Sequence, residues 1–227
     1  MKKRLEIIMS VLLLASAVFL ARKGAETVLS SKLENRQICV CVDAGHGGGD
    51  PGKIGVNDEL EKDINLQIAY KVKNLLEQQD VKTVMLRKQD GNLADQDAKN
   101  QKVSDMQNRV AAIEESEAQL TISIHQNSYP DPSVKGAQVF YYSESEEGRR
   151  LAETIQKSLT DRLNDGNTRE AKANDSYYML KKTPTPTVIV ECGFLSNYEE
   201  SALLSEDMYQ ERIAWAIVMG IMQYLNQ

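Results

Sequence analysis

Apolar and polar positions alternate along the chain in blocks that predict strands and helices in turn. Short apolar runs predict buried strands at 38–43, Val81–Leu86, Leu120–Ile124, Ala137–Tyr142 and Thr187–Glu191. Apolar residues at helical spacing predict helices at Glu61–Gln79, Ser104–Glu117, Glu146–Leu163, Glu199–Leu204 and Met208–Leu225. Because strands alternate with helices, we expect a single α/β domain with a twisted, mostly parallel or mixed sheet of about five to six strands flanked by helices.

Polar blocks separate these elements and predict the surface of the domain. Residues 88–103 are rich in Gln, Asp, Asn and Lys and predict a mobile surface loop. Ser104 follows as a candidate N-cap for the next helix. Tyr129-Pro130-Asp131-Pro132 predicts a turn, and Asn164–Ser176 is expected to lie over the surface.

The N-terminal segment has the pattern of a targeting sequence. Lys2-Lys3-Arg4 precedes an apolar run from Ile7 to Ala21, and Arg22-Lys23 closes it. As a helix this run would span roughly 22 Å, short of the roughly 30 Å hydrocarbon core of a bilayer. A tilted membrane anchor and a cleaved signal peptide both fit, and the anchor is slightly favoured. A buried core helix fits less well because both flanks are basic.

We therefore divide the chain into three parts: a signal peptide or membrane anchor at 1–23, a polar linker at 24–36 and a catalytic domain at 37–227. Because basic residues stay on the cytoplasmic side, the rest of the chain is expected to be exported to the outer face of the cytoplasmic membrane or the cell wall. The net charge of −6 argues against a nucleic-acid partner, and 41% apolar residues are enough for a substantial core.

The chain has three cysteines, Cys39, Cys41 and Cys192. In an exported protein they raise the question of a disulfide. Cys39 and Cys41 share one face of a predicted strand, and Cys192 follows another. A thiolate metal site is an alternative, but we expect reduced, buried cysteines that act as small hydrophobic residues.

The only two histidines of the chain follow two predicted strands. His46 lies in a glycine-rich loop after the first strand, and His125 follows the run Leu120–Ile124. In α/β proteins, binding sites form at the carboxyl ends of strands. Two histidines and one carboxylate are a common ligand set for catalytic zinc, so we predict a metal site with both histidines as ligands. The carboxylate would come from Asp58, Glu59, Glu61 or Asp63, and spacing alone leaves that choice open.

Glu191 directly follows the buried run Val188-Ile189-Val190. An unpaired acid at the end of a central strand is costly to bury, which favours a functional role over an ordinary surface charge. A metal site that activates water also needs a base to accept the proton of that water. We therefore predict Glu191 as the base.

The segment Gly47–Gly52 also satisfies the G-x-G-x-x-G fingerprint of dinucleotide-binding proteins. Asp50 would repel a pyrophosphate, and Pro51 lacks the N–H that the phosphate would need. The fingerprint also leaves His125 and Glu191 unexplained. We regard it as the weaker interpretation.

Four motifs in order carry a resemblance to a known family: Asp43-Ala44-Gly45-His46-Gly47-Gly48, Glu61-Lys62-Asp63, Ser123-Ile124-His125-Gln126-Asn127 and Glu191-Cys192-Gly193-Phe194-Leu195-Ser196-Asn197. Over roughly residues 37–226 the chain resembles the zinc-dependent N-acetylmuramoyl-L-alanine amidases of the amidase-3 family.

This resemblance implies one zinc ion held by His46, Glu61 and His125, with Glu191 as the catalytic acid and base. Asn127 is a further candidate for substrate binding. The implied reaction is hydrolysis of the amide bond between N-acetylmuramic acid and L-alanine in peptidoglycan. The expected partners are glycan strands with stem peptides, and the membrane if the N-terminal segment stays uncleaved. No residue identifies a protein activator, although one is compatible with an exposed zinc site.

A short chain without wall-binding repeats, together with the pattern Asn167–Lys172, further resembles members of this family that act in spore cortex maturation. There the expected role is removal of the peptide before muramic-δ-lactam formation. Two alternatives stay open: a catalytically silent peptidoglycan-binding or regulatory module, and a zinc peptidase that cuts elsewhere in the stem peptide. The presence of all three predicted ligands and of Glu191 argues against the silent module.

Overall fold

The computed structural model describes Lys3, Met9, residues 13–24 and residues 38–227, and its contacts divide the chain into two units, Met1–Gln37 and Ile38–Gln227. In the first unit, residues 13–24 are helical. Among the described residues, no helix has both the length and the apolar character needed to cross a bilayer. The predicted linker at 24–36 lies outside the described residues except for Gly24, and the predicted targeting segment is described only in part. Both stay predictions.

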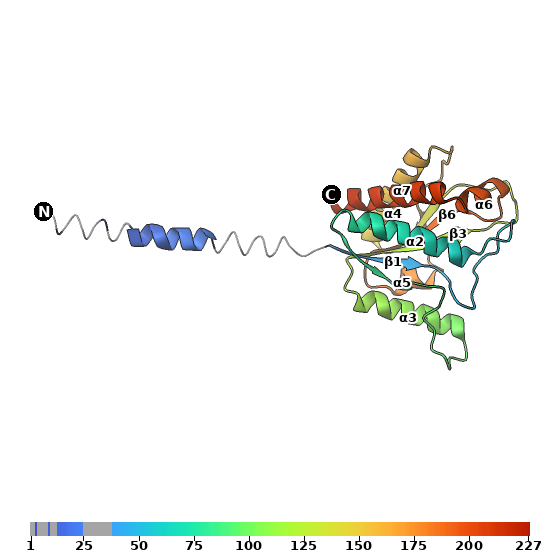
Figure 1. The fold of residues 1–227 in the computed structure, drawn as a ribbon, viewed down its shortest axis with the longest axis horizontal. Helices are drawn as coiled ribbons and strands as arrows, with labels where there is room; N and C mark the ends of the chain where they lie inside the picture. Colours follow the sequence, from blue (N-terminus) through green and yellow to red (C-terminus); the bar gives the residue numbers. More distant parts are fainter. Residues whose placement is uncertain (1–2, 4–8, 10–12, 25–37) are drawn as a thin grey trace. The chain divides into compact units, whose positions relative to one another are not determined.

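The second unit is built around a six-stranded mixed sheet with the strand order β2-β1-β3-β6-β4-β5 (Figure 1). The strands are β1 Cys39–Ala44, β2 Lys82–Met85, β3 Leu120–Asn127, β4 Gln138–Tyr141, β5 Lys172–Ala173 and β6 Thr187–Phe194. The helices are α2 Glu61–Glu77, α3 Gln101–Glu115, α4 Glu146–Leu163, α5 Tyr178–Lys182, α6 Tyr198–Leu204 and α7 Asp207–Leu225. The α/β domain predicted from the alternating pattern is confirmed.

Four strands of the sheet run in one direction, and the last two, β4 and β5, run in the opposite direction. β1 pairs in parallel with β2 and β3, and β3 pairs in parallel with β6. β4 then pairs with β6 in the antiparallel direction. Because β1, β3 and β6 are adjacent and parallel, their carboxyl ends meet at one edge of the sheet, where a site can form.

Alternating side chains of β1 show why both faces of the sheet are covered. Val40 and Val42 belong to the large core with α2, α4 and α7, whereas Cys39 and Cys41 pack in a smaller cluster with Ile113 of α3. Figure 1 shows α2, α4 and α7 on one side of the sheet and α3 and α5 on the other. All three cysteines are free and buried, as predicted.

The structure corrects several predicted element boundaries. Helix α3 begins three residues before the predicted N-cap, and its N-cap is Asn100, whose side chain accepts a hydrogen bond from Val103 N; the prediction of Ser104 was wrong. Strands β3 and β6 continue beyond His125 and Glu191, so neither residue ends its strand. Sequence patterns also missed β5 and α5, because two and five residues are too few to show a period.

Candidate metal centre

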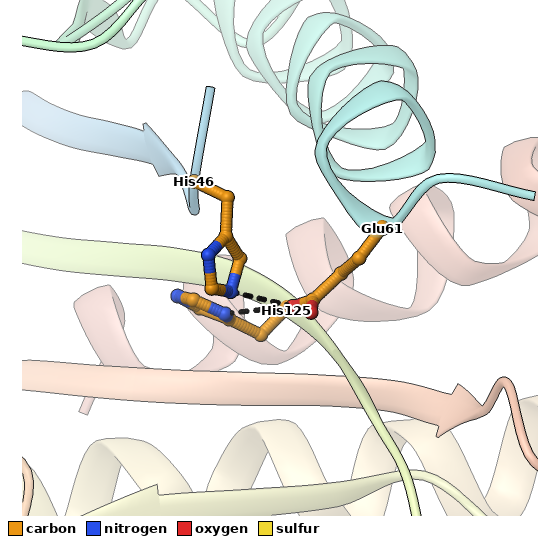
Figure 2. Close-up of side chains that lie close together, drawn as sticks. All are labelled: His46, Glu61 and His125. Carbon is orange, nitrogen blue, oxygen red and sulfur yellow. Dashed lines mark hydrogen bonds and ion pairs between the residues drawn. The ribbon is translucent and has the colours of Figure 1, made fainter. Parts of the chain in front are cut away.

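Three side chains from separate elements converge at the carboxyl edge of the sheet: His46 after β1, Glu61 at the start of α2 and His125 on β3 (Figure 2). Their ligand atoms all lie within 4.8 Å of one another. Glu61 Oε1 lies 2.9 Å from His125 Nδ1 and 3.2 Å from His46 Nε2. The two imidazole rings meet edge to face with centroids 5.0 Å apart. Two imidazole nitrogens and a carboxylate oxygen in this arrangement fit the ligand set of a zinc ion.

The backbone at His46 has an unusual conformation that aims the side chain into this cluster. Its φ is 62°, in the left-handed region that non-glycine residues rarely adopt. Buried arginines hold the loop from the opposite side: Arg109 Nη2 donates to His46 O at 2.7 Å, and Arg87 donates to the carbonyls of Ala44 and Gly45. These hydrogen bonds offset the cost of the strained conformation.

Two glycines leave room for the converging side chains. A Cβ at Gly45 would overlap the imidazole ring of His125. At Gly52, where φ is 70°, a Cβ would lie 2.5 Å from Glu61 Oε2 and 2.7 Å from His46 Cδ2. Gly45 and Gly52 are therefore needed for side-chain packing at the cluster.

Glu61 is the acid that the structure places against the histidines. Its Oε2 accepts a hydrogen bond from Lys53 N, and its Oε1 accepts one from Gln126 N. Burial works against ionisation of this carboxyl, but the hydrogen bonds from His125 and His46 outweigh it and lower the pKa of Glu61. Of the other acids predicted as alternatives, Glu59 instead bonds to Ser201 and Asn57, and Asp58 and Asp63 are exposed.

Asp50 contacts the outer nitrogen of His46, a role that the sequence did not reveal. His46 Nδ1 lies 2.9 Å from Asp50 Oδ2. When Nδ1 carries the proton and donates to this carboxylate, Nε2 is left with a lone pair directed towards Glu61. A carboxylate behind a histidine in this way fixes the tautomer and the ring orientation of a metal ligand.

Glu191 lies beside the cluster on β6, paired in register with His125 on β3. Its side chain is buried, and Oε2 has no hydrogen-bond partner in the part of the chain that the structure describes. Oε1 lies 3.4 Å from the hydroxyl of Tyr177. Burial raises the pKa of Glu191 to about 7, with a smaller contribution from the charge of Glu61 and an opposing one from His125. A carboxyl with a pKa near neutrality can both accept and return a proton.

A cleft of about 380 Å³ joins these groups. Every residue predicted from the sequence as a site residue lines it: His46, Glu61, His125, Asn127 and Glu191. The sequence analysis did not predict the other lining residues as part of the site, among them Asp50, Lys53, Lys102 and Tyr177. Asp50 could have been noticed from its position four residues after His46, whereas Tyr177 lies in a segment without any periodic pattern.

Comparisons with known proteins identify the family to which the chain belongs. Residues 40–223 match the amidase-3 family, described as N-acetylmuramoyl-L-alanine amidase. A germination-specific N-acetylmuramoyl-L-alanine amidase of Bacillus subtilis is 38% identical over 191 residues, which cover 83% of this chain and 80% of that protein. The CwlD amidase from Clostridioides difficile, solved in complex with the GerS lipoprotein, is similar with a TM-score of 0.80 and 37% identity over 83% of this chain and 98% of that chain. The amidase AmiC2 of Nostoc punctiforme gives a TM-score of 0.75 and 32% identity over 84% of this chain and 98% of that chain.

Proposed function

The chain belongs to the N-acetylmuramoyl-L-alanine amidase family, and from this premise we propose that it hydrolyses the bond between the lactyl group of N-acetylmuramic acid and L-alanine with one zinc ion per chain. The observation that carries the proposal is the meeting of His46, Glu61 and His125 with the unpartnered carboxyl oxygen of Glu191 in one cleft. An acid with a raised pKa beside a metal-ligand cluster is a common feature of hydrolytic sites.

In this proposal each residue has a separate role. His46 Nε2, His125 Nδ1 and a Glu61 carboxylate oxygen hold the zinc, and Asp50 keeps the His46 ring in the ligating tautomer. Zinc supplies Lewis-acid chemistry there, which polarises a carbonyl and makes a water more acidic. Glu191 Oε2 accepts the proton of the attacking water and then donates it to the nitrogen of the leaving alanine. Asn127, in the wall of the cleft, contacts the substrate.

We place this activity in spore cortex maturation, outside the cytoplasmic membrane. The similarity to a germination-specific amidase and to CwlD supports this role. Removal of the peptide would then precede lactam closure by another enzyme, and residues 1–23 would act as the signal peptide or anchor. The complex of CwlD with a lipoprotein supports a protein partner for this chain as well.

Digestion of purified peptidoglycan, followed by mass spectrometry of the new ends, tests the proposed reaction. The expected products are a free lactyl carboxylate and a peptide with N-terminal alanine, formed with zinc and lost after chelation. New ends elsewhere in the stem would identify a zinc peptidase instead. Absence of new ends with a zinc-loaded, folded protein would identify a silent binding module.

A further inference from the structure

The catalytic cleft continues into a second hollow on the side of helix α3. This hollow has a volume of about 500 Å³ and is lined by Gly49, Asp50, Asn92, Gln101, Lys102 and Asp105. Asp50 and Lys102 also line the catalytic cleft, so the two hollows meet at these side chains. The pair forms a groove that begins at the metal centre and extends past Lys102. When a substrate is hydrolysed at the metal centre, the second hollow has room for the part of the substrate on one side of the scissile bond.

Lys102 is an exposed positive charge at this junction. It lies in the first turn of α3, and its charge interacts with that of Asp50 across the junction. The nearby walls are acidic, with Asp50 and Asp105 in the second hollow and Glu191 in the cleft. A neutral sugar would gain little from a cation here. A substrate carboxylate beside Asp50, in contrast, needs a nearby cation to offset the repulsion between the two negative charges.

The two parts of the proposed substrate, on either side of the scissile bond, differ in charge. The glycan side is uncharged near the scissile bond, whereas the peptide side continues after L-alanine with D-glutamate, whose α-carboxylate is free because the chain proceeds through the γ-carboxyl. We infer that the second hollow takes the stem peptide and that Lys102 is a specificity-determining residue that binds this first carboxylate beyond L-alanine. The inference rests on the proposed function, because it assigns a direction to the same substrate.

A pair of substrates that differ by one charge tests this assignment on the zinc-loaded full-length protein. Disaccharide-L-alanyl-D-glutamate and its D-isoglutamine counterpart, both capped as an amide at the γ-carboxyl, are compared by kcat/KM. The wild type should prefer the carboxylate, mainly through KM, by roughly fivefold, the size expected for an exposed charge pair. Lys102→Met should remove this preference, so that the two substrates have equal kcat/KM values in the variant.

Two other lysines serve as matched controls. Lys53 lines the catalytic cleft but not the second hollow, so Lys53→Met should keep the preference if Lys102 acts locally. Lys157 pairs with Asp161 on the exposed face of α4, and Lys157→Met reports any general effect of lost charge. If the Lys53 and Lys102 variants lose the preference equally, the preference comes from the combined positive charge of the cleft and not from a specific contact with Lys102, and the assignment fails. A wild type without any preference, or a Lys102→Met variant that keeps it, would overturn the assignment.

Binding separates this inference from the proposed reaction. The dissociation constants of the same two ligands are measured by calorimetry on Glu191→Gln and on Glu191→Gln/Lys102→Met. If the carboxylate preference depends on Lys102 but no alanine-terminated peptide is ever released by the wild type, the groove assignment stands and the hydrolytic proposal fails. If both substrates are cleaved and bound without regard to charge, the hydrolytic proposal stands and the assignment of Lys102 fails.

Discussion

Arg109 on α3 and Asp43 on β1 form an ion pair in which both side chains are almost completely buried. Ser123 Oγ donates a second hydrogen bond to Asp43 at 2.6 Å. Arg109 also donates to the carbonyls of Ala44 and His46. One arginine therefore ties a helix on one face of the sheet to the strand and the loop that carry a predicted metal ligand.

Loss of this arginine should destabilise both the fold and the metal site. Arg109→Met leaves Asp43 buried without its cation, and we expect a loss of roughly 3–5 kcal/mol in the free energy of unfolding. Urea denaturation of the metal-free protein measures this change. Arg149, which pairs with Glu146 on an exposed helix face, is the matched control, and Arg149→Met should change the free energy of unfolding far less. Similar losses in the two variants would show that the buried pair has no special structural role.

The two histidines should be required together for zinc and for activity. His46→Ala and His125→Ala each remove one of three ligands, so zinc content and amidase activity should fall in parallel. The fold should survive, because a core of this size does not depend on one metal. Elemental analysis and circular dichroism of the purified variants measure the outcomes. Stoichiometric zinc in either variant would refute the ligand assignment.

Asp50 should affect zinc affinity without being a ligand. Asp50→Asn weakens the hydrogen bond to His46 Nδ1 and no longer favours the ligating tautomer, so zinc affinity should fall roughly 10–100-fold. Competition with a chelator of known affinity measures this change. Asp161→Asn, on the exposed face of α4, is the control and should leave zinc affinity unchanged. A complete loss of zinc from Asp50→Asn would instead place Asp50 among the ligands.

Sequence patterns predicted the alternation of strands and helices because buried strands and amphipathic helices have short, regular periods. They also predicted His46, His125 and Glu191 as functional residues, because each follows a buried run at the same edge of a parallel sheet. Spacing could not select Glu61 over Glu59, since both lie near the start of the same helix and only the fold shows which one faces the histidines. Arg109 and Asp43 lie 66 positions apart, and no local pattern indicates that they meet.

The cysteines should be unreactive in the folded protein. Burial raises the pKa of both Cys41 and Cys192, so neither forms the thiolate that alkylating agents attack. We expect Cys39, Cys41 and Cys192 to resist iodoacetamide in the native state and to react after denaturation, as measured by mass spectrometry. Replacing all three with Ala should keep zinc and activity and reduce stability through the cavities that form. Loss of zinc from the triple variant would favour thiolate ligation.

Glu191 should control proton transfer without holding the metal. Glu191→Gln keeps the size of the side chain but cannot accept a proton from water, so turnover should fall roughly 10²–10⁴-fold at unchanged zinc content. Glu191→Asp should also lose much of the rate, because the shorter side chain withdraws the carboxylate. Glu153→Gln, an exposed position on α4, is the control and should keep full activity. A Gln variant with wild-type turnover would exclude Glu191 as the base, and one without zinc would make it a ligand.

The same variant has a second effect, on the stability of the metal-free protein, whose sign follows from the raised pKa. The folded chain keeps the Glu191 proton up to about pH 7, whereas the unfolded chain releases it near 4.5, the ordinary pKa of a glutamate. Folding is therefore penalised increasingly as the pH rises from about 4.5 to above 7, and the penalty disappears at lower pH. Glu191→Gln lacks this carboxyl and should be more stable than the wild type at pH 8, by up to about 3 kcal/mol, with little difference near pH 4.5. Urea denaturation in the presence of a chelator at both pH values measures the difference. An equal effect at the two pH values would show that folding does not raise the pKa of this carboxyl, and Glu191 would then be a poor candidate for returning a proton to the leaving amine.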